Sequence, residues 1–127
     1  MQAEQRRYLL ISSGHSWAQA LLADAIGRGN QLTIAVDWVQ AARILRRNEY
    51  DAVLWDVNEP DVEDLVWLRQ VRRNAGLPVV LLLSAEAREE ALRGEQLGAA
   101  AWFHIPCDPR VLGARMDALM RRMVAVA

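Results

Sequence analysis

Five short apolar runs, separated by amphipathic stretches, constrain the fold of this chain more than any other feature of its sequence. The runs are at residues 8–11, 32–36, 51–56, 79–83 and 102–105. Between them, apolar residues recur every three or four positions, as they do on one face of a helix. The run at 79–83 is apolar at every position, which is typical of a parallel strand covered on both faces. The pattern therefore predicts an α/β domain of five βα units, with helices on both sides of a parallel sheet.

The helices expected between these runs have recognisable ends. We predict them over about 17–26, 38–48, 61–71 and 87–97, and from Pro109 onward. Asp108 followed by Pro109 is a strong helix start, because a capping carboxylate is followed by proline in the first turn. Gly98 ends the helix before the last strand. Trp38 begins the second helix, where we expect it to be partly exposed.

The length and composition of the chain limit its domain number, its compartment and the kinds of partner it can bind. Its 127 residues fit a single domain, residues 1–127, which could be the N-terminal part of something longer. A single cysteine, Cys107, excludes an intrachain disulfide and favours a reducing compartment, so we expect a cytoplasmic protein. No segment has the roughly 18 apolar residues of a membrane span. The net charge of −1 gives no electrostatic signature of nucleic acid or anionic lipid binding. All the basic residues are arginine, which we attribute to genome composition.

Polar residues follow several of the predicted strands. Ligands of parallel α/β sheets bind at the carboxyl ends of the strands. His15 and His104 are isolated from other metal-binding residue types, so we expect no metal site built on them. No nucleophile–base pair or carboxylate dyad is visible, so we do not expect an enzyme. The residues of interest at this edge are Ser12, Ser13, Asp56, Asn58, Ser84 and Ile105.

Three segments in the right order resemble the receiver domain of bacterial response regulators. They are residues 50–60 (YDAVLWDVNEP), 78–85 (PVVLLLSA) and 97–106 (LGAAAWFHIP). The resemblance covers the chain from about Tyr8 to Met123. It implies a flavodoxin-like (βα)5 three-layer sandwich whose five-stranded parallel sheet has the order 2-1-3-4-5. It also implies two-component signalling by phosphoryl transfer to an aspartate with the help of Mg²⁺.

Carried over by position, the resemblance makes Asp56 the phosphoacceptor candidate. It makes Ser84 and Trp102 the switch residues, and it places Asn58 where a backbone carbonyl would ligate the metal. Two departures affect the chemistry. Ser12 and Ser13 stand where the family has an acidic pair, and Ile105 stands where it has a lysine.

These departures remove charge from the site. Mg²⁺ prefers charged oxygen ligands, so we expect weak or absent binding, with Asp56 and Asn58 as the remaining weak candidates. A phosphoryl group on Asp56 would carry a charge of about −1.5 to −2 and would lack a lysine partner. Asp56 could instead be a structural carboxylate, hydrogen-bonded to Ser12, Ser13 or Ser84.

The sequence thus favours an atypical receiver, or pseudo-receiver, that acts as an interaction module independently of conventional phosphorylation. Its partner would be a protein: a kinase, an output domain, or a second copy bound through the edge face around Trp102. Two alternatives stay open. One is a working phosphoacceptor at Asp56. The other is a sensor of a small ligand in the vestigial pocket formed by Ser12, Ser13, Asn58 and Ile105.

Overall fold

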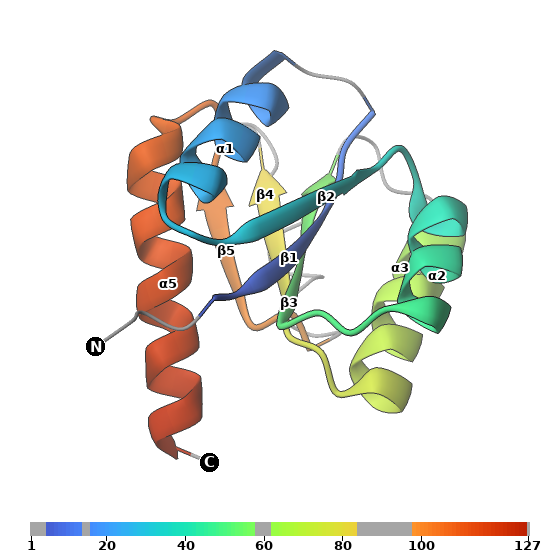
Figure 1. Ribbon diagram of the computed structural model, residues 1–127. Coiled ribbons are helices and arrows are strands. Elements are labelled where there is room, and N and C mark those ends of the chain that lie inside the picture. The colour runs from blue at the N-terminus through green and yellow to red at the C-terminus, as the bar shows by residue number, and fades with distance from the viewer. Residues whose placement is uncertain (1–4, 14–15, 58–61, 84–97, 127) are drawn as a thin grey trace.

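A computed structural model describes residues 5–13, 16–57, 62–83 and 98–126 of the chain (Figure 1). Five parallel strands form one sheet in the order β2-β1-β3-β4-β5, which confirms the predicted fold class and strand order. The strands are β1 (Arg7–Ile11), β2 (Gln31–Ala35), β3 (Ala52–Val57), β4 (Val79–Leu83) and β5 (Ala101–His104).

Helices cover both faces of this sheet, as the two-sided apolar strands require. Helices α1 (Ser16–Gly27) and α5 (Pro109–Val126) lie on one face. Helices α2 (Trp38–Arg47) and α3 (Val62–Gln70) lie on the other, and α3 continues into a π-helical turn at Val71–Ala75. The helix predicted over 87–97 lies outside the described residues. Within the described ranges, no helix is long and apolar enough to cross a membrane.

The central strand β3 divides the interior into two clusters. Every residue of β3 is buried. Val53, Trp55 and Val57 pack into the cluster under α2 and α3, whereas Ala52 and Leu54 pack into the cluster under α1 and α5. This alternation follows from the strand period of two, which sends successive side chains to opposite faces of the sheet.

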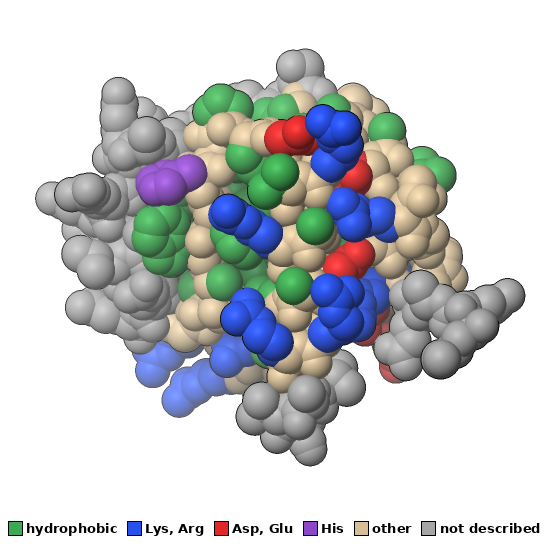
Figure 2. Space-filling view, turned by 90° about the vertical axis from the view of Figure 1, so that its left-hand side faces the viewer, with side chains coloured by type: hydrophobic (Ala, Val, Ile, Leu, Met, Phe, Trp, Pro, Cys, Tyr) green, Lys and Arg blue, Asp and Glu red, His purple; other side chains and the backbone are tan. Residues whose placement is uncertain are grey.

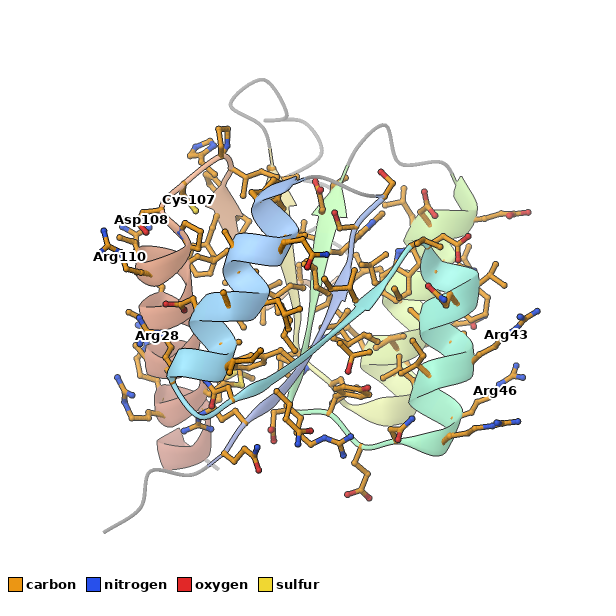
Figure 3. All side chains as sticks on the ribbon, turned by 45° about the horizontal axis from the view of Figure 1, so that its top comes forward. Arg28, Arg43, Arg46, Cys107, Asp108 and Arg110 are labelled. Carbon is orange, nitrogen blue, oxygen red and sulfur yellow. The ribbon has the colours of Figure 1, made fainter. Side chains whose placement is uncertain are left out.

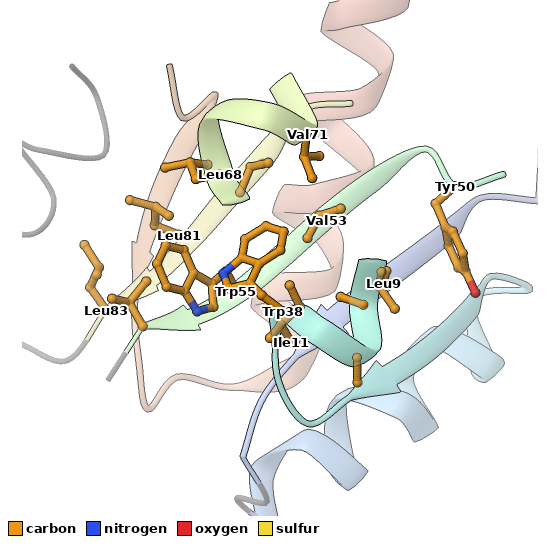
Figure 4. Packing of buried hydrophobic residues seen from close by; sticks show 14 residues of the cluster. Leu9, Ile11, Trp38, Tyr50, Val53, Trp55, Leu68, Val71, Leu81 and Leu83 are labelled. Carbon is orange, nitrogen blue, oxygen red and sulfur yellow. The ribbon is translucent and has the colours of Figure 1, made fainter. Parts of the chain in front are cut away.

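Trp38 contradicts the expectation of partial exposure. Only 2% of its surface is exposed, and its ring meets that of Trp55 edge-on, with centroids 5.4 Å apart (Figure 4). Asp37 caps α2 by accepting a hydrogen bond from the Gln40 amide at 2.8 Å. The cap starts the helix beside the sheet, and the first helical residue, Trp38, faces Trp55 of β3. The sequence marks a helix start but does not show which way that start faces.

A polar network ties the amino ends of β1 and β2 to α5. The Tyr8 hydroxyl donates to Asp117 Oδ1 at 2.7 Å, and Asn30 Nδ2 donates to the same oxygen at 3.0 Å. The Arg6 amide donates to Asn30 Oδ1 at 3.0 Å. Asp117 therefore has two hydrogen-bond donors from distant parts of the chain, which offsets its partial removal from water.

Helices α1 and α5 approach closely at Gly113. Arg28 pairs with Asp24 at 2.8 Å and donates to the Arg110 carbonyl at 2.7 Å. A Cβ atom at Gly113 would lie 2.8 Å from Arg28 Nε and would overlap the Asp24 carboxylate. The glycine therefore leaves room for the Asp24–Arg28 ion pair at the end of α1, where α1 faces α5.

The Tyr8–Asp117 hydrogen bond gives a test of this network. Burial, followed by the hydrogen bond and charge of Asp117, raises the pKa of Tyr8 far above its ordinary value. The unfolded chain loses this proton near pH 10 while the folded protein keeps it, so stability should fall as the pH rises above about 10. Tyr8→Phe should lower the free energy of unfolding at pH 7 by about 1–2 kcal/mol. It should also flatten the alkaline decline, as measured by urea unfolding across pH.

Tyr50→Phe is the matched control, because the Tyr50 hydroxyl donates to Thr33 Oγ1 at 2.9 Å rather than to a carboxylate. This variant should keep the alkaline decline of the parent protein. The chain contains no lysine to titrate in the same range. An undiminished decline in Tyr8→Phe would show that another group governs alkaline unfolding.

Candidate functional site

Ser12 and Asp56 meet at the carboxyl edge of the sheet. Strands β1 and β3 pair in register up to Ile11 and Trp55, which brings the next residue of each strand alongside the other. The Ser12 hydroxyl lies 3.1 Å from Asp56 Oδ2 and donates a hydrogen bond to it. Both residues are buried, with 2% and 9% of their surface exposed. One of the predicted structural partners of Asp56 is thereby confirmed as Ser12, whereas Ser13 is exposed.

Ile105 contributes an apolar side chain to the same face of the sheet. Asp56 alternates with Trp55 and Val57, so it follows Leu54 toward the α1 and α5 side. Ile105 packs against the cluster on that side, and its amide extends the sheet by donating to the Leu83 carbonyl at 2.8 Å. The Ile105–Pro106 peptide bond is cis. A methyl-bearing side chain therefore occupies the strand end where the resemblance predicts an ammonium group.

The described residues at this edge fit Mg²⁺ poorly. They supply one carboxylate, Asp56, and the hydroxyls of Ser12 and Ser13. The Ser12 hydroxyl already donates to the carboxylate with which it would have to share the ion. Mg²⁺ is usually bound through charged carboxylate oxygens in octahedral geometry. Among the described residues, no three His, Cys, Asp or Glu side chains gather where they could hold a metal ion.

Two of the predicted site residues, Asn58 and Ser84, lie outside the described residues. Cys107 follows the cis peptide bond and is half-buried against the cluster under α1 and α5. Burial raises the pKa of its thiol, so the thiol is less reactive than a free one. These features are those of a packed cysteine.

Trp102 and His104 lie together on β5, the edge strand. Their rings meet edge-on, with centroids 4.9 Å apart and planes at 86°. Trp102 is half-buried against the cluster under α2 and α3, while His104 is exposed. Phe103 and Ile105 pack on the opposite side, as the strand period of two requires. Figure 2 shows the neighbouring α5 side, where arginine and hydrophobic side chains are interspersed at the surface.

Sequence reasoning missed one group of charged residues. Arg43, Arg46 and Arg47 lie on α2, and all three are exposed. Their spacing of three and four residues places them on one helix face. The spacing is the sequence signal for this group, and composition alone does not reveal it.

The chain is similar in sequence to bacterial response regulators. It is 30% identical over 117 residues to the transcriptional activator protein PfeR of Pseudomonas aeruginosa, covering 92% of this chain and 38% of that protein. It is 28% identical over 122 residues to the DNA-binding response regulator MtrA of Mycobacterium tuberculosis, covering 96% of this chain and 54% of that protein. The chain thus spans about half or less of the length of these relatives. No protein-family model matches it.

Solved structures share the fold. A two-component response regulator from Clostridium difficile superposes with a TM-score of 0.83 at 20% identity, covering 94% of this chain and 98% of that one. The receiver domain of the TMAO respiratory system response regulator TorR gives 0.82 at 21% identity, covering 92% and 98%. Similarity along more than nine-tenths of the chain, together with this fold, strongly supports its assignment to the receiver domains of two-component response regulators.

Proposed function

We propose that this receiver domain regulates by binding protein partners, independently of conventional Mg²⁺-dependent phosphorylation of Asp56. It would act as a pseudo-receiver and not as an enzyme. The observation that carries this proposal is the buried hydrogen bond from Ser12 to Asp56. At the position where the resemblance implies a metal-binding carboxylate, the chain has a neutral hydroxyl, Ser12. This hydroxyl donates a hydrogen bond to Asp56, the phosphoacceptor candidate.

The charge balance of the site supports this proposal. A phosphorylated Asp56 would bring a charge of about −1.5 to −2 into a buried environment. Ser12 and Ser13 add no metal-binding charge, and Ile105 offers methyl groups instead of a cation. Phosphoryl transfer depends on electrostatic stabilisation of these oxygens, and the described residues provide little of it.

The edge face formed by Trp102 and His104 on β5 is the proposed partner surface. Aromatic residues are enriched at protein interfaces, and edge strands are common sites of pairing between chains. A kinase, an output domain or a second copy of the chain could bind there, and a second copy would make a symmetric homodimer. The net charge of −1 argues against nucleic acid as the partner of this domain.

An output domain in the same polypeptide is one such partner. PfeR is named a transcriptional activator and MtrA a DNA-binding response regulator, and both extend well beyond the region that this chain matches. By analogy, any DNA binding would belong to a further domain, which this domain would control through protein contacts.

The phosphorylation test uses intact mass and melting temperature. With Mg²⁺ and acetyl phosphate, we expect no phosphoryl mass gain and no Mg²⁺-dependent shift in melting temperature, because the charged ligands are missing. The variant Ser12→Asp/Ser13→Asp/Ile105→Lys restores the charges and should gain Mg²⁺ binding. A mass gain in the parent protein that Asp56→Asn abolishes would instead establish Asp56 as a working phosphoacceptor.

The edge-face homodimer is tested by sedimentation equilibrium. Trp102→Ala should weaken dimerisation by about tenfold or more, as expected for an aromatic residue near the centre of an interface. His104→Glu changes the same edge at an exposed position. It therefore tests the interface even if Trp102→Ala does not fold. Ile26→Ala, at an exposed site on α1, is the control and should not change dimerisation. A parent protein that stays monomeric at about 1 mM would rule out the homodimer.

A further inference from the structure

Helix α2 presents an arginine stripe, which we define as Arg43, Arg46 and Arg47. The side chains of Arg43 and Arg46 extend from α2 away from the sheet (Figure 3). Residues at this spacing are neighbours on a helix surface, so three guanidinium groups share one small area. Like charges so placed repel one another, and the stripe therefore costs stability unless something offsets it.

The described part of the protein offsets this charge only in part. No described Asp or Glu forms an ion pair with the arginine stripe. Asp37, the acidic residue nearest the start of α2, is engaged as the helix cap. The helix dipole favours Arg46 and Arg47, which lie in the last turn. Arg43 lies a turn earlier and gains little from the dipole.

Exposed valines adjoin the arginine stripe. Val39 lies one turn before Arg43 on the same helix face and is 54% exposed, and Val36, just before the helix, is 58% exposed. From Val39 to Arg47 the face is about 12 Å long, given a rise of about 1.5 Å per residue. This face therefore combines an apolar end with three cations over about two turns of helix.

We propose that this α2 face binds an acidic, amphipathic helical segment of a partner protein. Carboxylates at a spacing of three and four residues would meet the arginine stripe, and an apolar residue one turn further along would cover Val39. Arginine suits this role because its planar guanidinium can bind a carboxylate through two parallel hydrogen bonds. Binding would also relieve the repulsion among the three cations.

The observations favour a protein segment over nucleic acid or a membrane. Binding to phosphate backbones or anionic lipids draws on broad positive charge, whereas this chain has 16 acidic and 15 basic residues. Exposed valines beside the arginines fit the mixed apolar and polar character of protein interfaces. The α2 face is separate from the Trp102 edge, because α2 packs over β1 and β2, toward the edge of the sheet opposite to β5.

The probe is a synthetic helix-forming peptide with three glutamates and one leucine at the matching spacing. Its control replaces the glutamates by glutamine. Titration into ¹⁵N-labelled protein should shift the amide resonances of α2, and the control peptide should bind at least about tenfold more weakly. Arg43→Glu/Arg46→Glu should weaken binding by about tenfold or more, since it reverses two of the three charges.

Arg121→Glu/Arg122→Glu is the matched protein variant. These residues are also exposed, but they lie on α5, so the same change in net charge should leave peptide affinity within about twofold. If Arg43→Glu/Arg46→Glu does not fold, Arg43→Gln/Arg46→Gln can replace it, with a smaller expected loss of peptide affinity. Trp102→Ala should not affect this binding, so failure of the proposed edge interface would be seen separately.

Three results would overturn the proposal. The first is no shift of α2 resonances at about 1 mM peptide. The second is an equal loss of affinity in the α2 and α5 variants, which would mean general charge attraction. The third is tighter binding of duplex DNA or phosphatidylserine vesicles than of the peptide at about 0.15 M salt, which would identify the wrong class of partner.

Discussion

The complete burial of β3 is the constraint on which the rest of the structure depends. A strand covered on both faces cannot leave a polar side chain unsatisfied without a cost of about 1–3 kcal/mol. Asp56 lies within this strand, so its carboxylate needs a partner at the edge of the sheet. Ser12 provides one from the adjacent strand end. The same parallel pairing that builds the core therefore determines which residues can form the candidate site.

Because side chains alternate along each strand, the candidate site and the proposed partner surface lie on opposite faces of the sheet. Asp56 and Ile105 lie toward α1 and α5, whereas Trp102 packs toward α3. A change at Asp56 can reach Trp102 only through the sheet itself, by way of β4 and β5, or through residues outside the described part of the chain. If Asp56 keeps its hydrogen bond to the Ser12 hydroxyl and is not phosphorylated, no signal has to travel from Asp56 to Trp102. Under the proposed function, the partner surface at Trp102 does not depend on a change at Asp56.

Much of the fold could be predicted from the sequence because it rests on local patterns. Apolar runs predicted the strands and their parallel arrangement, and the resemblance predicted the strand order. Exposure of Trp38 was predicted wrongly, because a helix start does not reveal which residue it turns toward the sheet. The bond between Tyr8 and Asp117 joins residues 109 positions apart, and no local pattern links them. Ser12 was one of three predicted partners of Asp56, and the register of β1 and β3, which no local pattern reveals, brings it to the carboxylate.

The net charge of the chain can be counted from its sequence, whereas the location of its unpaired charges depends on the tertiary structure. A net charge of −1 suggests a domain without a strong preference for charged partners. That sum conceals how the charges are distributed, because Asp24 and Asp117 are engaged with Arg28, Tyr8 and Asn30 between the helices and strands. Carboxylates used inside the structure cannot neutralise arginines on its surface. A nearly neutral domain can therefore present a local positive face on α2, and a partner responds to that face rather than to the net charge.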